Sequence, residues 1–324
     1  MKVSSSIVIT IIWLFCFSCK KEEQSLLPFQ AYYLGKDVRI NDIHVLTDSV
    51  WIACGGIRGK EGYIFRTEDA GSNWSCFSAN NNRSFYCVEF RDSLHGFAGG
   101  DFLDLWQTND GGKSWQFYWL GLQVPLNEED RPAIRDFKFV TDSLWYFCAG
   151  ENLYKGVLYR TVDAGSTWEF QFLENEFRSI EFDSEKNGIV AGHGAIRTMN
   201  NGDLISHASD FKDDFITGLT RLTDETILGV SYSGKTYRSQ DKGENWNTIE
   251  KQANRYVNQV QWNHIASSES RVVMVGNYGV LNLSEDSGGS WSQYLLDKDT
   301  HLLKSMVAGT RIFVTTGDGR IFVF

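Results

Sequence analysis

The sequence predicts an all-β protein made of repeated small sheets, and three observations indicate this class. Short runs of alternating β-branched and aromatic residues occur along the whole chain, whereas helical periodicity never extends beyond a few turns. Pro is scarce, with 3 residues, while the aromatic residues include 11 Trp, 13 Tyr and 22 Phe. Finally, the stretch Arg160–Trp168, RTVDAGSTW, recurs along the chain.

The recurring stretch has the form (S/T)xDxGxxW. Its good copies centre on Asp69, Asp110, Asp163, Asp241 and Asp286, and a decayed copy carries Asn200 instead of Asp. An Asp side chain can accept hydrogen bonds from backbone N–H groups just downstream and so close a turn. The Gly two positions later suits a left-handed backbone, and the Trp that follows supplies a large apolar surface at the start of a strand. Each copy is therefore expected to be a hairpin turn between two strands.

The spacing of the copies predicts radial four-stranded units. The Asp positions, with Asn200 included, are separated by 41, 53, 37, 41 and 45 residues, a period typical of propellers. The first unit is expected to consist of Asn41–Val45, Val50–Gly56, Tyr63–Thr67 and Trp74–Phe77. The opening strands of the following units are expected at Phe85–Phe90, Ile134–Phe139, Phe177–Phe182, Ile216–Leu222 and Val257–Trp262.

The two ends of the chain complete the ring. The C-terminal tail provides only Leu302–Val307, Arg311–Thr316 and Arg320–Phe324, and the unassigned run Phe29–Leu34 can provide the missing strand. Closure of this kind removes an open sheet edge. We therefore predict one seven-bladed β-propeller domain over residues 29–324, with six blades as the alternative if the fourth blade is merged or the tail is not a blade.

With these repeats, residues 29–324 resemble the Asp-box (BNR) propellers. The chain looks most similar to the secreted and lipidated group related to the photosystem II assembly-factor propellers. Sialidases and sortilin-type receptors share the same box. The resemblance implies the fold, and it implies little about function, because the box is a turn and not a site.

The N-terminus predicts a bacterial lipoprotein. Lys2 and the apolar segment Ile7–Phe17 have the length of a signal peptide and are too short to span a bilayer. Ser18-Cys19 resembles a lipobox, which would make residues 1–18 the signal peptide, Cys19 the lipid-bearing residue and 19–28 a tether. Cys16 departs from the usual Leu, and an ordinary secretory signal cut elsewhere is the alternative. The run Lys20–Glu23 is either a surface-export signal or a solvated tether, so the outer membrane or cell surface is the expected location.

Composition and cysteine usage limit the partners. The net charge is −10, and loss of Lys2 with the signal peptide makes it −11, which argues against nucleic acid as a partner. No CxxC or Cys/His cluster indicates a metal, and no cofactor is expected. An extracytoplasmic chain permits disulfides. However, each remaining cysteine lies in an apolar run, so buried free thiols are expected at Cys54, Cys76, Cys87 and Cys148. We expect a monomer.

The strongest candidate site is a ring of polar residues at the channel mouth. The opening strands align on the inward apolar residues Ile43, Val88, Phe137, Ile180, Leu219, Val260 and Met306. Two residues earlier stand Asn41, Tyr86, Arg135, Arg178, Thr217, Asn258 and Lys304. Three cations on an acidic protein indicate a centre for an anion or carboxylate, since Arg binds carboxylates in a bidentate manner. The alternative is plain solvation of the channel mouth.

Loops on the same face complete this candidate site. Those between second and third strands carry the rim residues Arg58, Asp101, Glu151, His193, Tyr232, Asn277, Tyr278 and Asp318. The longest connection, Leu120–Pro132, carries Glu128, Glu129, Asp130 and Arg131 and is either a recognition loop or a tolerated insertion.

Catalytic signals are weak. The Phe-Arg-Ile-Pro stretch of sialidases is absent, because Phe65-Arg66 continues directly into the first box. Asp101 and Asp318 are not singled out as a glycosidase pair, and no nucleophile-elbow signature occurs. We therefore assign no catalytic residue and expect an anchored binding, scaffolding or assembly module for a protein, peptide or glycan. A sialidase-like glycoside hydrolase is the alternative.

Overall fold

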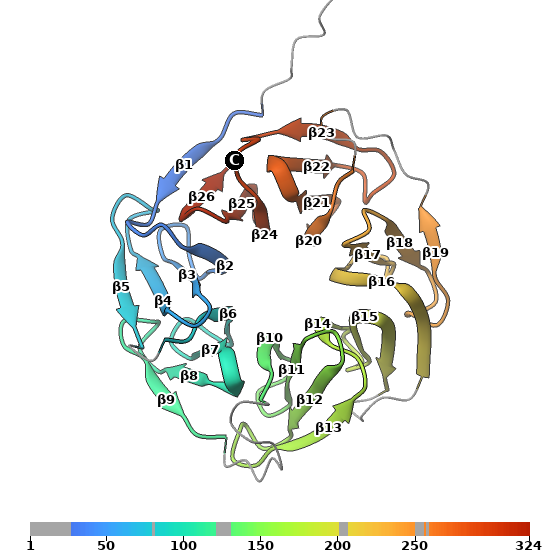
Figure 1. The fold of residues 1–324 in the computed structure, drawn as a ribbon, viewed down its shortest axis with the longest axis horizontal. Helices are drawn as coiled ribbons and strands as arrows, with labels where there is room; N and C mark the ends of the chain where they lie inside the picture. Colours follow the sequence, from blue (N-terminus) through green and yellow to red (C-terminus); the bar gives the residue numbers. More distant parts are fainter. Residues whose placement is uncertain (1–26, 80–81, 121–130, 201–206, 250–255, 257–258) are drawn as a thin grey trace, which may run out of the picture.

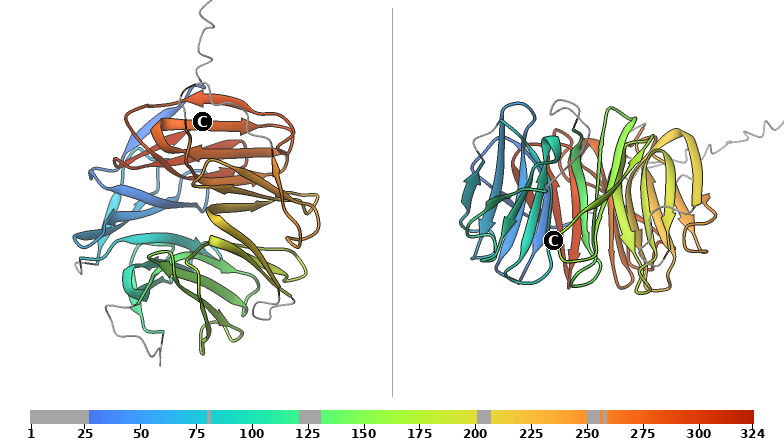
Figure 2. Two further views of the ribbon diagram at one scale, coloured as in Figure 1. Left: turned by 45° about the vertical axis from the view of Figure 1, so that its right-hand side comes forward. Right: turned by 90° about the horizontal axis from the view of Figure 1, so that it is seen from below.

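The computed structural model describes residues 27–79, 82–120, 131–200, 207–249, 256 and 259–324. In this part of the chain, β-sheets stand radially around a central axis (Figure 1) and form a flat disc when seen from the side (Figure 2). The all-β propeller predicted from the sequence is confirmed. Among the described residues, no helix is long and apolar enough to cross a membrane.

Four of the sheets are formed by consecutive strands. They are β2 (Arg39–Val45), β3 (Trp51–Ile57), β4 (Glu61–Thr67) and β5 (Ser75–Ser78); β6 (Phe85–Phe90), β7 (Gly96–Gly100), β8 (Leu105–Thr108) and β9 (Gln116–Tyr118); β10 (Ala133–Phe139), β11 (Trp145–Glu151), β12 (Lys155–Thr161) and β13 (Glu169–Leu173); and β20 (Trp262–Ser268), β21 (Arg271–Gly276), β22 (Val280–Ser284) and β23 (Ser292–Leu295). Short 3-10 turns, η1 (Asp101–Leu103) and η3 (Asn277–Gly279), lie between second and third strands.

The number of sheets differs from the main expectation. The described residues form six hydrogen-bonded sheets and not seven, which matches the six-blade alternative. The predicted fourth and fifth blades are merged into one sheet of β14 (Phe177–Phe182), β15 (Gly188–Met199), β16 (His207–Arg221), β17 (Ile227–Ser231), β18 (Thr236–Ser239) and β19 (Asn247–Ile249).

Two long strands cause this merger. Gly188 lies close to Met199, since a Cβ added at Gly188 would meet the Met199 methyl at 2.6 Å. The two ends of β15 can approach in this way only because the chain turns back near Gly194, where φ is 67°. The strand β16 pairs with β15 through residues 207–210 and 215, and with β17 through residues 216–221. Because β16 continues without a break from the outer edge of one unit to the inner strand of the next, this sheet contributes two inner strands.

The ends of the chain close the ring as predicted. The strand β1 (Gln30–Tyr33) pairs antiparallel with β26 (Arg320–Val323), and β25 (Arg311–Thr316) and β24 (Leu302–Ala308) complete this sheet. The ring of Phe29 packs on Phe322 at 4.6 Å between centroids. The first and last strands thus cover each other's free edges.

The recurring turns have the predicted geometry in all five good copies. In the third copy, Asp163 accepts a hydrogen bond from the Thr167 backbone N–H at 2.8 Å and from the Thr161 hydroxyl at 2.8 Å. The Thr161 oxygen in turn accepts the N–H of Gly165, whose φ of 88° requires a left-handed backbone. The same bonds recur around Asp69, Asp110, Asp241 and Asp286. The decayed copy at Asn200 runs into 201–206, outside the described residues.

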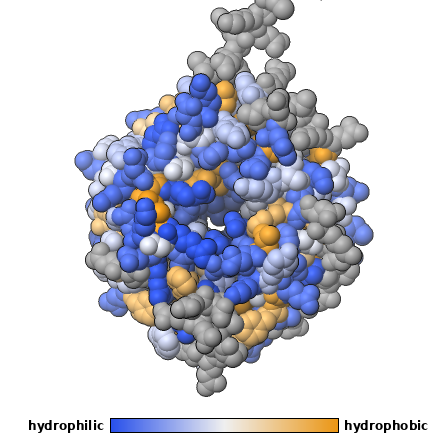
Figure 3. All heavy atoms as spheres, in the orientation of Figure 1, coloured by the Kyte–Doolittle hydropathy of each residue, from blue (hydrophilic) through white to orange (hydrophobic). Residues whose placement is uncertain are grey.

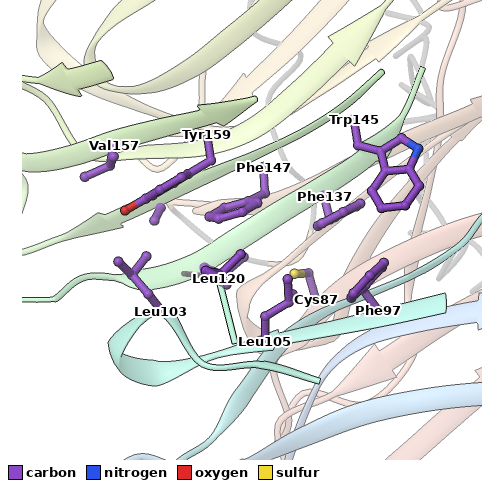
Figure 4. Close-up of a cluster of buried hydrophobic side chains, with 12 residues drawn as sticks. Cys87, Phe97, Leu103, Leu105, Leu120, Phe137, Trp145, Phe147, Val157 and Tyr159 are labelled. Atoms are coloured by element: carbon purple, nitrogen blue, oxygen red, sulfur yellow. The ribbon is translucent and has the colours of Figure 1, made fainter. Parts of the chain in front are cut away.

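Hydrophobic clusters fill the wedges between neighbouring sheets. In one of them, Phe97 and Leu105 of the second sheet pack against Phe137 and Phe147 of the third (Figure 4). Burial of such aromatic side chains contributes about 1.5–3 kcal/mol each. The thiols of Cys54, Cys87 and Cys148 are free and buried as predicted, whereas the prediction was wrong for Cys76, which lies exposed on the outer strand β5.

The turn carboxylates make stability dependent on acid pH. Backbone and hydroxyl donors of Ser290 lower the pKa of Asp286 from 3.8 to about 2. For Asp110, burial acts in the opposite direction, but the Ser114 donors outweigh it and the pKa is again about 2. A depressed folded-state pKa stabilises the fold above the unfolded value of 3.8, and this contribution is lost as pH falls toward 2.

We therefore expect the thermal unfolding midpoint to decrease as the pH is lowered from about 4 to about 2. They should fall less steeply in Asp110→Asn and Asp286→Asn than in the wild type, as measured by circular dichroism melting. Asp37→Asn, at an exposed position outside the turns, is the control and should keep the wild-type slope. Equal slopes in all the proteins would contradict the assignment of these turns as acid-sensitive.

Candidate functional site

A β-bulge in every inner strand aims one side chain at the axis. The pairing register skips one residue in β2, β6, β10, β14, β16 and β20, and it skips Leu303 and Lys304 in β24. The skipped residues are Asn41, Tyr86, Arg135, Arg178, Thr217 and Asn263. Bulges bend a strand locally and re-aim its side chains, which explains why these residues converge on one cavity.

This central cavity has a volume of about 610 Å³. All of the skipped residues line it, together with Arg39, Gly56, Arg58, Ser84, Leu153, Phe215, Tyr232, His264, Leu303 and Lys304. The volume lies within the roughly 300–1,000 Å³ typical of ligand sites. Figure 3 shows hydrophilic residues gathered around the hollowed centre of the ring.

Glu176 organises the cationic wall of the cavity. Its buried carboxylate accepts a hydrogen bond from Arg178 Nε at 2.8 Å and lies 3.7 Å from an Arg135 nitrogen. Burial alone would raise the pKa of Glu176, but the two guanidinium groups and the Leu153 N–H lower it below its usual value. The carboxylate therefore stays ionised and fixes both arginines at the cavity.

The two arginines also rest on aromatic rings. Arg135 lies 4.5 Å from the Tyr86 ring centroid and donates to the Gly150 carbonyl at 3.0 Å, while Arg178 lies 4.8 Å from the Phe215 ring. Such cation–π contacts hold a guanidinium flat against the ring. The side chain of Arg178 remains 39% exposed, so its outer edge is open to a ligand.

Arg39 provides a further cation that has no partner of its own. Among the described residues, its guanidinium makes no hydrogen bond or ion pair, and the residue is exposed at the cavity mouth. Loss of solvent between the cavity walls lowers the pKa of Arg39, and the nearby Arg178 lowers it further. An arginine stays protonated in proteins despite such shifts, so Arg39 and Arg178 repel each other until an anion lies between them.

The other sides of the mouth are held by internal contacts. Asp101 is buried and accepts hydrogen bonds from the Ser84 N–H and the Tyr86 hydroxyl, and burial with this carboxylate raises the pKa of Tyr86 to about 12. Arg58 is paired with Glu151 and lies 3.7 Å from Asp101. Both acids are therefore engaged by donors of the wall, and neither forms an ion pair with Arg39.

At four of the bulges, the residue that follows accepts a hydrogen bond from a neighbouring inner strand. Asp42 accepts the N–H of Val88 at 3.0 Å, Asp136 accepts that of Ile180 at 2.9 Å, and Ser179 accepts that of Leu219 at 3.1 Å. His264 Nδ1 lies 3.3 Å from the N–H of Ser305, and burial lowers the pKa of this histidine well below its ordinary value, so it accepts as a neutral ring. These contacts set the distance between neighbouring blades around the cavity.

Lys304 lies deeper than the arginines, at the base of the cavity. Its ammonium group is 3.7 Å from Asp42 and also borders a second cavity of about 300 Å³ at the opposite end of the axis. At that end Lys138 pairs with Glu181 at 3.3 Å, and His44 lies 3.5 Å from Glu89. The cationic character is thus confined to the first cavity.

The structure brings together most of the sequence-predicted ring and corrects one member. Asn41, Tyr86, Arg135, Arg178 and Lys304 line the cavity as predicted. Asn258 lies outside the described residues, and the expected strand Val257–Trp262 is wrong, because β20 begins only at Trp262. Its inward apolar residue is Ile265 and not Val260, which places Asn263 at the bulge.

Several loop residues are not part of the lining. His193 packs behind it, with its ring 5.8 Å from Phe215, while Tyr278 is 49% exposed and packs on His301. The other rim side chains outside the lining bind within the protein: Asn277 accepts the Gln261 N–H, and Asp318 pairs with Arg320. The predicted recognition loop is described only at Leu120, Arg131 and Pro132.

Sequence reasoning missed Arg39, Leu153 and Phe215, whereas Tyr232 was among the predicted rim residues. Arg39 stands two residues before Asn41 on the same strand, so extension of the alternation by one step would have found it. Leu153 carried no usable signal, because its exposure depends on loop conformation, and Phe215 carried none, because it lies in the long strand β16 ahead of the predicted strand Ile216–Leu222. His264 was missed because the residue after the bulge was not considered.

Radial sheets, recurring Asp turns and an axial cavity define a β-propeller of the Asp-box class. Within that class, the chain belongs to the family of the photosynthesis system II assembly factor YCF48, whose family model matches residues 67–323.

Solved structures agree with this fold. A YCF48 bound to D1 peptide is 19% identical with a TM-score of 0.73, covering 93% of this chain and 96% of that one. YCF48 from Cyanidioschyzon merolae is 17% identical with a TM-score of 0.71, covering 91% and 98%. A chain of a mitotic checkpoint complex is only 8% identical, with a TM-score of 0.70 over 99% and 98%, so the architecture extends beyond the family. No curated protein matches the chain.

Because Glu176 is buried, its two arginines matter for stability. We expect Arg135→Ala combined with Arg178→Ala to lower the free energy of unfolding by about 3 kcal/mol, since a buried carboxylate loses its cationic partners. If both arginines were simply solvated at the channel mouth, the double substitution would leave the free energy of unfolding almost unchanged. Urea denaturation measures the loss, and adding Glu176→Gln should restore part of it. A double variant as stable as the wild type would contradict the role of Glu176.

Proposed function

We propose that this protein is an assembly or scaffolding module that captures a peptide segment of another protein by its anionic group, in the central cavity. The carrying observation is Arg39, a cation of the cavity lining that makes no hydrogen bond or ion pair with the described residues and is repelled by Arg178. The family relationship supports this proposal, as does the related YCF48 that was solved with a peptide bound.

A carboxylate is the anion that fits this cavity best. Arg39 and Arg178 approach it from different sheets, and Lys304 adds positive charge at the base. Hydrogen bonds between charged partners contribute about 1.5–3 kcal/mol each. A free peptide C-terminus presents such a group on a narrow chain that can enter an axial cavity. No contact of the described residues favours glycan cleavage, since Asp101 is held by Ser84 and Tyr86.

Arg39→Ala tests this function without disturbing the wall. The probe is a pool of fluorescein-labelled hexapeptides, each made with a free C-terminal carboxylate and as the amide. We expect the wild type to bind the carboxylate form about tenfold more tightly than the amide, and Arg39→Ala to lose this preference, in fluorescence anisotropy. The control is Arg271→Ala, which removes a cation paired with Glu285 away from the cavity. Equal binding of acid and amide by the wild type would refute the proposal.

We also propose that Cys19 carries lipid and anchors the protein at the outer membrane or cell surface. The apolar segment Ile7–Phe17 followed by Ser18-Cys19 supports this. Stable anchoring needs more than one acyl chain, and lipoprotein processing supplies several.

The anchor is tested by Cys19→Ser, with Cys16→Ser as the matched control in the same segment. Cys19→Ser should abolish incorporation of labelled palmitate and move the protein from the membrane pellet to the soluble fraction. Cys16→Ser should leave both unchanged. Palmitate labelling that survives Cys19→Ser would exclude this anchor.

A further inference from the structure

The cavity has an apolar wall beside its cations. Leu153 lies in the loop that follows β11, Phe215 lies in β16, and Tyr232 lies in the loop that follows β17. All three line the cavity. Leu153 is 38% exposed and Tyr232 is 49% exposed, which is unusual for large apolar side chains that face a pocket. Tyr232 and Phe215 are held together, because the Tyr232 N–H donates to the Phe215 carbonyl at 2.9 Å.

Leu153 is fixed in a conformation that leucine seldom adopts. Its φ is 71°, in the left-handed region that favours glycine. Glu176 holds it there, since its carboxylate accepts the Leu153 N–H at 2.9 Å and its own N–H donates to the Leu153 carbonyl at 3.0 Å. The carboxylate that fixes Arg135 and Arg178 therefore also fixes Leu153.

The equivalent leucine of the preceding blade shows what this backbone normally serves. Leu103, with φ of 61°, occupies the same place in the loop after β7. Its side chain is only 4% exposed and packs in the core beside Leu120. Leu153 has the same backbone but no such cover, so its strain is not offset by burial within the described chain. Strain of this kind concentrates at binding sites.

The cationic and the apolar side of the cavity adjoin each other. The Arg178 guanidinium rests on the Phe215 ring, 4.8 Å from its centroid, and Leu153 and Tyr232 line the same cavity. One extended residue spans about 3.3–3.6 Å. A carboxylate bound at Arg178 thus has the side chain of its own residue within reach of Phe215, Leu153 and Tyr232. The opposite side of the mouth, with Asn41, Arg58 and Ser84, is polar and would not favour that side chain.

We infer that the ligand is a peptide or protein tail that ends in a large apolar residue such as Phe or Leu. The arginines bind its terminal carboxylate, and the wall of Leu153, Phe215 and Tyr232 binds its last side chain. This inference rests on the proposed capture of a carboxylate and adds to it the chemical class of the terminal residue. Leu153 and Tyr232 determine specificity, whereas the arginines supply the affinity common to all free C-termini.

The test compares labelled peptides of one sequence, Gly-Ser-Gly-Ser-Gly followed by Phe, Leu or Gly, with a free carboxylate. The full-length protein in detergent should bind the Phe and Leu forms about tenfold more tightly than the Gly form, as expected when an apolar side chain leaves water. Leu153→Ser and Tyr232→Ser should each reduce this ratio to below about threefold, because each removes part of the apolar wall. Two independent variants protect the test against a local folding defect in either.

Tyr278→Ser is the matched control, because Tyr278 is also 49% exposed and lies in a corresponding loop but does not line the cavity. It should keep the wild-type ratio. If all free-acid peptides bind the wild type equally, the apolar terminal residue is refuted while carboxylate capture stands. If Phe-ending acid and Phe-ending amide bind equally, carboxylate capture fails and this inference fails with it.

Discussion

The architecture of this protein depends on one extra residue in the inner strand of each radial unit. The bulge turns that residue toward the axis, as seen for Arg135 in β10 and Arg178 in β14. The residue that follows is turned toward the next strand, where Asp136 accepts the N–H of Ile180. The same irregularity therefore builds the cavity and joins the blades, so a change in one is expected to affect the other.

Glu176 shows how closely binding and packing are coupled. Its carboxylate is buried, holds two guanidinium groups and keeps Leu153 in a left-handed backbone. A buried carboxylate is tolerated only because these donors satisfy it. One acid thus fixes a strained leucine and two arginines, and all three of these residues line the same cavity. Arg39 makes no hydrogen bond or ion pair with any described residue, so no acid of that part of the chain compensates its charge in the cavity lining.

Much of the fold followed from local chemistry. The Asp turns need only a carboxylate, a hydroxyl and a glycine at fixed spacing, so their geometry and the closure of β1 on β26 were predictable. The merger of two units could be named only as an alternative, because it depends on β16 running unbroken from an outer to an inner position. Nor was the register of β20, because the apolar residues Val260 and Trp262 suggested a strand several residues too early.

The site was predictable to the extent that strand alternation controls it. Alternation placed Asn41, Tyr86 and Arg135 correctly, since each stands two residues before the inward apolar residue of its strand. The exposure of Leu153 depends instead on loop backbone. Leu103 and Leu153 each stand three residues after a Gly and two after an acidic residue, yet Leu103 is buried and Leu153 is exposed. Only the three-dimensional neighbours distinguish them.

The direction of β1 has a consequence for how partners approach. Gln30 pairs with Val323 and Tyr33 with Arg320, so β1 begins at the end of the disc that carries the Asp turns and runs toward the end that carries the cationic mouth. A tether that precedes β1 would therefore leave from the back of the disc. If the molecule were held at that point, its cationic mouth would face away from the anchor and toward chain ends in the surrounding space.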